Sequence, residues 1–263
     1  MRRIAFINEK GGTCKTTLCV NLGAYLAREK NKRVLLVDLD TQGHAGKSLG
    51  LDVRALTPTV FDLLTRDDLT VSQVARGTAV PGLDVVPSNK AMSEFPVAVA
   101  HRPDRARRLD RVMQGLSLYD YIFYDAPPSM SLTTVNIMAA SDEVVIPVAL
   151  TYLALDGCAE MVETVRKVSA DHQRPDLRVS MVVPTLYRHT ALADEILGKL
   201  QAYFPKELSG TALGYNVKLD EAQSHGQTIW DYAPSCAGAK MLRAIGDELI
   251  ARGKRQPARA ASA

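Results

Sequence analysis

With 263 residues, 46% of them hydrophobic and 23% charged, the chain has the length and composition of one large globular α/β domain. The sequence holds no run of about 18 apolar residues and no long apolar segment near its start, so neither a transmembrane helix nor a signal peptide is expected. The net charge of +3 permits nucleic-acid binding but is too small to argue for it. The four cysteines form no C-x-x-C pair and no zinc spacing with histidine, a usage that fits a reducing cytoplasm.

Short apolar runs alternate with amphipathic stretches along most of the chain. The runs are expected as buried strands at residues 4–7, 34–37, 83–86, 121–124, 144–148 and 179–183. The stretches are expected as helices at residues 16–29, 133–140, 155–168, 191–203 and 237–251. Strands that alternate with helices predict an α/β fold with a doubly wound, mostly parallel sheet flanked by helices.

The pattern contains no internal repeat and no linker, so residues 1–252 are expected to form a single domain. Residues 52–82 contain Pro58, Gly77, Pro81 and Gly82, which predicts an irregular excursion at the periphery. Residues 253–263 are basic and rich in small side chains, which predicts a disordered tail.

The segment between the first expected strand and the first expected helix is rich in glycine and lysine. Residues 10–17 read Lys-Gly-Gly-Thr-Cys-Lys-Thr-Thr, and the ordinary phosphate-binding loop G-x-x-x-x-G-K-[ST] fails here because Glu9 and Cys14 stand where it has glycine. The pattern that fits is K-G-G-x-x-K-[ST]. Gly11 and Gly12 let the backbone approach phosphate oxygens, and the N-terminus of the following helix favours anions.

This order of strand, glycine-rich turn, Lys-Thr and helix predicts a P-loop nucleotide site. Lys15 is expected to reach the β- and γ-phosphates, and the Thr16 hydroxyl is expected to bind Mg²⁺. The loop residues expected to contact ATP are Lys10, Gly11, Gly12, Thr13, Cys14, Lys15, Thr16 and Thr17.

Two other expected strands end in aspartate. Asp125 ends an apolar strand in the form of a Walker B element and is expected to hold Mg²⁺, through water. Asp38 and Asp40 lie at the carboxyl end of another strand, where ligands sit in open α/β sheets. They share a side of an extended chain, so both are expected to face the phosphates; the alternative is a turn or helix-cap pair. The expected metal-site residues are Thr16, Asp38 and Asp125.

Four segments together resemble the ParA/Soj family of partition ATPases, within the deviant Walker A class of P-loop proteins that includes MinD. They are the glycine-rich loop at 10–17, Val-Asp-Leu-Asp-Thr-Gln-Gly at 37–43, the segment 119–129 around Asp125, and Asn-Val-Lys-Leu-Asp-Glu-Ala at 216–222. The resemblance extends over roughly residues 3–252, and the motifs occur in the expected order.

The resemblance implies an ATPase with ATP and Mg²⁺ as cofactors that forms a homodimer when it binds ATP. In such a dimer Lys10 reaches the partner's phosphates and acts as an arginine finger does, while Asp40 positions the attacking water. Asn216 falls where the family contacts adenine. Lys10, Lys15 and Asp40 are therefore the expected catalytic residues, and hydrolysis is expected to be slow until an activating partner, ParB-like in kind, stimulates it.

Cys14 departs from the family, in which most members have glycine immediately before the catalytic lysine. We expect ATP binding to survive the departure, because a Cβ atom is tolerable there if the backbone φ stays negative. Thr41 departs as well, since many members have proline, and no functional meaning attaches to it.

Non-specific DNA binding by the ATP-bound dimer is the output that the sequence favours. No amphipathic helix with bulky apolar residues follows residue 250, so membrane binding is not expected, and the cysteines lack the motifs of a shared iron–sulfur cluster. The resemblance places DNA contacts on basic residues late in the chain, with solvated surface charge as the alternative for each. The expected contacts are Arg188, His189, Lys218 and Arg243, to which Arg252, Lys254 and Arg255 could add.

The arginine-rich segment 101–111 is interleaved with Asp104 and Asp110 and is expected to form a solvated helix face; a partner or DNA surface is the alternative. The first strand begins at once, so a helix-turn-helix domain for operator binding is not expected. The sequence thus predicts a cytoplasmic, nucleoid-associated ATP switch for chromosome or plasmid partition. Positioning of the division site or of a protein cluster is the alternative within this class, and a regulatory adaptor that does not bind DNA is the alternative outside it.

Overall fold

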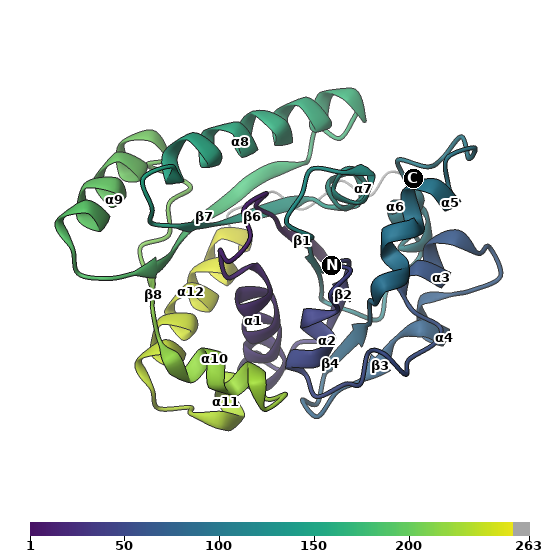
Figure 1. Ribbon diagram of the computed structural model, residues 1–263, viewed down its shortest axis with the longest axis horizontal. Helices are drawn as coiled ribbons and strands as arrows, with labels where there is room; N and C mark the ends of the chain where they lie inside the picture. The colour runs from purple at the N-terminus through teal and green to yellow at the C-terminus, as the bar shows by residue number, and fades with distance from the viewer. Residues whose placement is uncertain (255–263) are drawn as a thin grey trace.

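The computed structural model describes residues 1–254 and places them around one eight-stranded sheet (Figure 1). The strand order is β3-β4-β2-β5-β1-β6-β7-β8, and every pair of neighbours is parallel except β3 with β4. The expected α/β fold with a mostly parallel, doubly wound sheet is therefore confirmed. The strands are β1 (Arg2–Phe6), β2 (Val34–Asp38), β3 (Arg76–Gly77), β4 (Leu83–Val86), β5 (Tyr121–Asp125), β6 (Glu143–Ala149), β7 (Arg178–Tyr187) and β8 (Leu213–Gly214).

Helices cover both faces of the sheet, in two layers that Figure 1 separates clearly. One layer contains α1 (Lys15–Lys30), α2 (His44–Ser48), α10 (Val217–Ser224), α11 (Ile229–Tyr232) and α12 (Ala237–Lys254). The other contains α3 (Val60–Thr65), α4 (Val71–Val74), the 3₁₀ helix η1 (Lys90–Glu94), α5 (Phe95–Ala98), α6 (Arg108–Val112), α7 (Leu132–Ala140), α8 (Ala154–Asp171) and α9 (Ala191–Tyr203). No helix within residues 1–254 is both long and apolar enough to cross a membrane.

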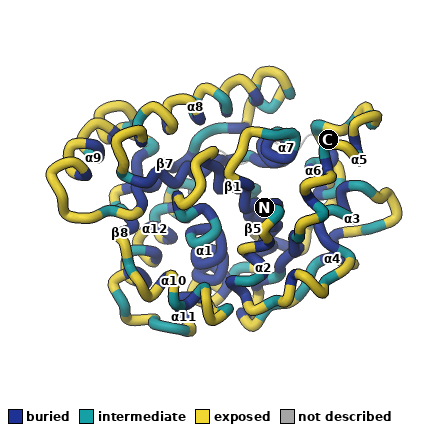
Figure 2. The backbone as a smooth tube through the Cα atoms, in the orientation of Figure 1, coloured by how far each residue is buried: buried dark blue, intermediate teal, exposed yellow. Residues whose placement is uncertain are grey.

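The central strands are apolar on both sides because each side packs against one helical layer. In β1, Ile4 and Phe6 join the core beneath α1 and α12, while Ala5 joins the core beneath α3 to α9. Figure 2 shows the result as a buried sheet, with α1 buried along most of its length. Since successive strand residues point to opposite faces, a continuous apolar run is what such a strand requires.

The excursion at residues 52–82 is more regular than expected. It contains two short helices, α3 and α4, and the edge strand β3. Each helix begins with a capping box, in which Thr59 pairs with Asp62 and Thr70 pairs with Gln73. The Thr-x-x-Asp and Thr-x-x-Gln spacings were visible in the sequence. Their side chains accept hydrogen bonds from N–H groups that the first turn of a short helix otherwise leaves unpaired.

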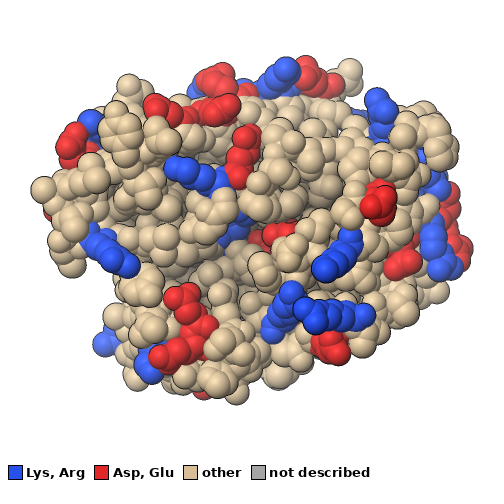
Figure 3. Space-filling view, viewed as in Figure 1, with Lys and Arg blue, Asp and Glu red and all other residues tan. Residues whose placement is uncertain are grey.

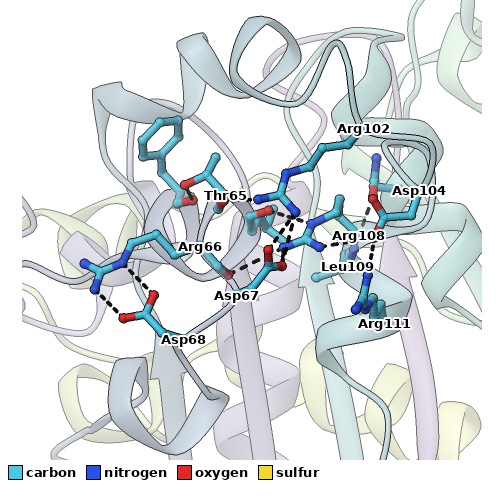
Figure 4. Close-up of polar contacts among 12 residues, drawn as sticks. Thr65, Arg66, Asp67, Asp68, Arg102, Asp104, Arg108, Leu109 and Arg111 are labelled. Atoms are coloured by element: carbon cyan, nitrogen blue, oxygen red, sulfur yellow. Dashed lines mark hydrogen bonds and ion pairs between the residues drawn. The ribbon is translucent and has the colours of Figure 1, made fainter.

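The expectation that segment 101–111 forms a solvated helix face is wrong for Arg108. Its side chain is 1% exposed, and its Nε donates to the Leu64 carbonyl oxygen at 2.8 Å. Its two terminal nitrogens bind Asp67 at 2.9 Å and Asp104 at 3.1 Å (Figure 4). The interleaved acid is thus a partner of a buried cation, which fastens α6 to the end of α3. Arg105, Arg107 and Arg111 are exposed and fit the expectation of a solvated segment.

Helix α12 ends at Lys254, two residues beyond the expected domain boundary at 252. Residues 255–263, which make up most of the expected tail and include Arg255, lie outside the described residues.

Replacing Arg108 with alanine is expected to lower the free energy of unfolding by about 3 kcal/mol, because the buried Leu64 carbonyl loses a donor and Asp67 and Asp104 each lose one of their partners. Arg111→Ala is the matched control: it removes an exposed partner of the same Asp104 and should cost less than about 0.5 kcal/mol. Urea unfolding of both variants measures the difference, and equal losses would contradict a structural role for Arg108.

Candidate functional site

The glycine-rich loop joins β1 to α1 and lines a pocket of about 900 Å³ at the carboxyl edge of the sheet. Gly12 has φ of +70°, and Cβ atoms built at Gly11 and Gly12 would meet nothing within 4 Å. The backbone of the loop is therefore open to a ligand, and the N-terminus of α1 directs N–H groups at it. This arrangement suits phosphate groups, as the sequence predicts.

The two lysines of the loop lie in different surroundings. Lys15 is buried, and its Nζ donates to the Lys10 carbonyl oxygen at 3.0 Å inside the pocket. Burial lowers the pKa of Lys15, an effect that the charges of Asp125 and Asp40 oppose. Lys10 is exposed, and its Nζ lies 3.4 Å from the Thr151 hydroxyl; it does not line the pocket of its own chain.

Thr16 and Asp125 place two side-chain oxygens next to each other beside the loop. The Thr16 hydroxyl donates to Asp125 Oδ2 at 2.7 Å, while Asp125 Oδ1 is buried and has no hydrogen-bond partner among residues 1–254. Burial raises the pKa of Asp125 to about 7, because the charged form lacks solvent. A buried carboxylate oxygen without a donor, next to a hydroxyl, suits the hard cation Mg²⁺, so these residues fit the expected metal.

Asp38 lies next to Asp125 in the sheet, and its carboxylate is already in use. Its Oδ1 accepts the Asp40 N–H at 3.1 Å, and its Oδ2 accepts the N–H groups of Ala45 at 3.0 Å and Gly46 at 3.3 Å. Burial first, and the charge of Asp125 second, raise the pKa of Asp38. A metal-binding role for Asp38 stays a prediction, whereas its bonds make it the anchor of α2.

Asp40 lies at the same edge and lines the pocket, with Oδ1 accepting the Gln42 N–H at 3.0 Å. Its role in positioning water stays a prediction. The extended conformation that would place Asp38 and Asp40 on one side of the chain ends at Asp38, the last residue of β2. Beyond it the chain turns through Gly43, whose φ is +62°.

Cys14 breaks the condition set for it in the sequence, since its φ is +66° rather than negative. The left-handed conformation costs a residue with a Cβ atom roughly 1 kcal/mol. Burial raises the pKa of its thiol to about 11, so the reactive thiolate is scarce at neutral pH. Leu186, which also lines the pocket, has a positive φ of 54° too, so backbone strain gathers at this site.

Part of the pocket lining was not predicted from the sequence. It contains Leu186, Tyr215 and Gln223, and Gln223 Nε2 donates to the Thr17 hydroxyl at 3.0 Å. Asn216, the residue expected near adenine, instead caps α10 by accepting the Lys218 N–H and does not line the pocket; its contact with adenine stays a prediction. Leu186 and Tyr215 lie at the carboxyl ends of β7 and β8, where ligands bind in α/β sheets, and that position was the available signal.

The basic residues expected to bind DNA are each engaged within the chain. Lys218 pairs with Glu221 at 2.7 Å, and Arg243 pairs with Glu29 at 3.1 Å. The Arg188 guanidinium lies 4.7 Å from the centre of the Tyr215 ring, and His189 Nδ1 lies 3.1 Å from the Tyr187 hydroxyl. Their DNA contacts stay predictions.

The comparisons with known proteins find relatives that match most of the length of this chain. A family model described as an AAA domain matches residues 1–179. The chain is 39% identical to the sporulation initiation inhibitor protein Soj of Bacillus subtilis, over 95% of this chain and 98% of that one. It is 40% identical to the chromosome-partitioning ATPase Soj of Thermus thermophilus, over 96% of each. The crystal structure of cobyrinic acid a,c-diamide synthase from Mycobacterium smegmatis with ATP analogue and magnesium gives a TM-score of 0.85 at 28% identity, over 97% of this chain and 96% of that one.

Cys14→Gly is expected to retain ATP binding and to raise the free energy of unfolding by about 1 kcal/mol, because glycine adopts the left-handed conformation without strain. Cys14→Ala is the matched control, since it removes the thiol but keeps the Cβ atom and the strain. Thermal unfolding and ATP titration measure the two effects. Loss of ATP binding in the glycine variant, or equal stabilities of the two variants, would contradict the strain argument.

Asp125→Asn is expected to change how the stability of the nucleotide-free protein depends on pH. The pKa of Asp125 is higher in the folded chain, so its cost to the fold appears above the unfolded pKa of about 4 and is complete above about 7. The variant should therefore gain about 2 kcal/mol over the wild type between about pH 5 and pH 7.5. Urea unfolding at the two pH values measures the gain, and parallel profiles would argue against a buried, titrating carboxyl.

Proposed function

We propose that this chain, which belongs to the ParA/Soj family of chromosome-partitioning ATPases, is a dimerising switch that binds DNA in its ATP state. The chain is an ATPase, and its cofactors are ATP and Mg²⁺. What we infer beyond this is how the residues of the site act, with which partners, and where in the cell.

The phosphates bind along the glycine-rich loop. Main-chain N–H groups of the loop and of the first turn of α1 donate to phosphate oxygens, and Lys15 adds a positive charge that is already held inside the pocket. Thr16 and Asp125 would hold Mg²⁺, which would supply positive charge against the phosphates. Asp40, at the pocket edge, orients the water that attacks the terminal phosphate.

The observation that carries dimerisation is the different placement of the two lysines. Lys15 lies inside the pocket of its own chain, whereas Lys10 lies outside that pocket and is exposed. A lysine placed there is available to the pocket of a second copy. Large apolar side chains are exposed near it: Tyr152, at 83% exposure, and Leu153 directly follow Thr151, the neighbour of Lys10. Such exposed apolar groups suit a surface that a partner covers.

In this proposal Asp38 couples the nucleotide-binding site to the protein surface. The charge of Asp125 raises the pKa of the Asp38 carboxyl, and the same carboxylate accepts hydrogen bonds from the N–H groups of Ala45 and Gly46 in α2. A change of charge at Asp125 therefore changes the hydrogen-bond acceptor that fixes α2. A shift of this one short helix is then the structural change that ATP binding sets and hydrolysis resets.

The proposed partners are a second copy of this chain, non-specific DNA of the nucleoid, and an activating protein that is ParB-like in kind. The proposed location is the cytoplasm, on the nucleoid, and the proposed task is the segregation of chromosomes or plasmids. DNA binding by phosphate contacts alone carries no sequence information and weakens steeply with salt.

Lys10→Ala is expected to retain ATP binding and to lose ATP-dependent dimerisation or partner-stimulated turnover, because the variant keeps its own pocket intact. Sedimentation velocity with ATP·Mg²⁺ and with ADP·Mg²⁺ measures the dimer. Lys15→Ala is the matched control: it removes the same charge from inside the pocket and should lose ATP binding itself. A Lys10→Ala protein that dimerises and responds as the wild type does would refute the role in the second copy.

A further inference from the structure

A group of cations lies beside the nucleotide pocket. Lys47 of α2, Arg54 and Lys90 line a second pocket of about 570 Å³, together with the polar side chains of Thr41, Gln42 and Asn89. Figure 3 shows Lys and Arg side chains gathered over α2 on this face. We call Lys47, Arg54 and Lys90 the switch patch.

The switch patch is not compensated from within the chain. Among residues 1–254, no carboxylate lines this pocket, and none of the three cations has an ion pair. Asp52 is the acid nearest to Arg54 in sequence, and one of its oxygens accepts the Arg54 main-chain N–H. The contrast with Lys218 and Arg243 is direct, because those two must give up Glu221 and Glu29 before they can serve a phosphate.

The switch patch is also connected to the nucleotide. Thr41, Gln42 and Lys47 line both the nucleotide pocket and the second pocket. Lys47 stands on α2, whose first N–H groups Asp38 holds from the end of β2. The position of Lys47 relative to Arg54 and Lys90 therefore depends on the helix that the buried carboxylates fix.

We propose that the switch patch contacts the phosphate backbone of DNA and does so in a manner set by the bound nucleotide. This inference rests on the proposed function and assigns part of its DNA surface. Arg54 and Lys90 are exposed and Lys47 is half-buried, so long cationic side chains are available to a backbone that runs across the pocket. Duplex DNA carries one charge per roughly 1.7 Å of axis, so adjacent cations meet adjacent phosphates and release their counterions.

The test is the salt dependence of DNA binding by the full chain with ATP·Mg²⁺, measured on a random-sequence duplex. Each lost phosphate contact reduces the slope of log K against log salt concentration by about 0.9. The double variant Arg54→Ala/Lys90→Ala is expected to reduce the slope by about 2 and to weaken binding about tenfold or more at moderate salt. Lys47 is left unchanged because it also lines the nucleotide pocket.

Lys167→Ala/Lys206→Ala is the matched control. Both lysines are exposed and lie outside the two pockets, so this variant removes the same charge and should leave the slope within about 0.3 of the wild type. The midpoint of thermal unfolding, measured on every variant, confirms that the fold is intact.

The outcomes separate the inference from the function on which it rests. If the wild type with ATP shows no salt-sensitive DNA binding, the proposed function itself fails. If the wild type binds and Arg54→Ala/Lys90→Ala keeps the wild-type slope, the switch patch does not contact DNA and the inference is overturned. The same holds if the variant keeps that slope but loses its response to an activating protein, because the patch is then a protein-docking surface.

Discussion

Two buried carboxylates at the ends of neighbouring parallel strands are the constraint on which the rest of the site depends. Asp38 and Asp125 are register partners in β2 and β5, and both are fully buried. Burial raises the pKa of each, and the charge of Asp40 adds to this at both, so keeping the two carboxylates ionised destabilises the fold in the absence of a cation. Mg²⁺ bound beside these carboxylates, as proposed, would offset that destabilisation, so ligand binding would be coupled to the stability of the site.

The two carboxylates have different hydrogen-bond partners. Asp125 accepts a hydrogen bond from the Thr16 hydroxyl and has one oxygen without a donor, whereas both oxygens of Asp38 accept hydrogen bonds from main-chain N–H groups. One carboxylate is thus available to a metal and the other holds a helix. Because the two are adjacent, chemistry at the phosphate site is coupled to α2, and α2 carries Lys47 to the surface beside the pocket. The proposed DNA surface and the nucleotide site are then parts of one arrangement.

Much of this was readable in the sequence, and the part that was not has physical reasons. Continuous apolar runs predict strands buried on both faces, and their terminal aspartates predict the edge at which the site lies. The buried state of Arg108 escaped prediction because its partner Asp67 lies 41 residues away and meets it only in the folded chain. The positive φ of Cys14 escaped because the residue type argues against that conformation and only the loop geometry imposes it. Leu186 and Tyr215 escaped because they are ordinary apolar residues until two strands bring them to the pocket.

The central claim is that the nucleotide acts on the surface through Asp38 and α2. The measurement that tests it most directly is amide hydrogen exchange at Ala45 and Gly46, the N–H groups that Asp38 accepts, compared between ATP·Mg²⁺ and ADP·Mg²⁺. The account predicts a clear difference in protection between the two nucleotides in the wild type and no such difference in Asp38→Asn. Equal protection of these amides with ATP and with ADP in the wild type would contradict it.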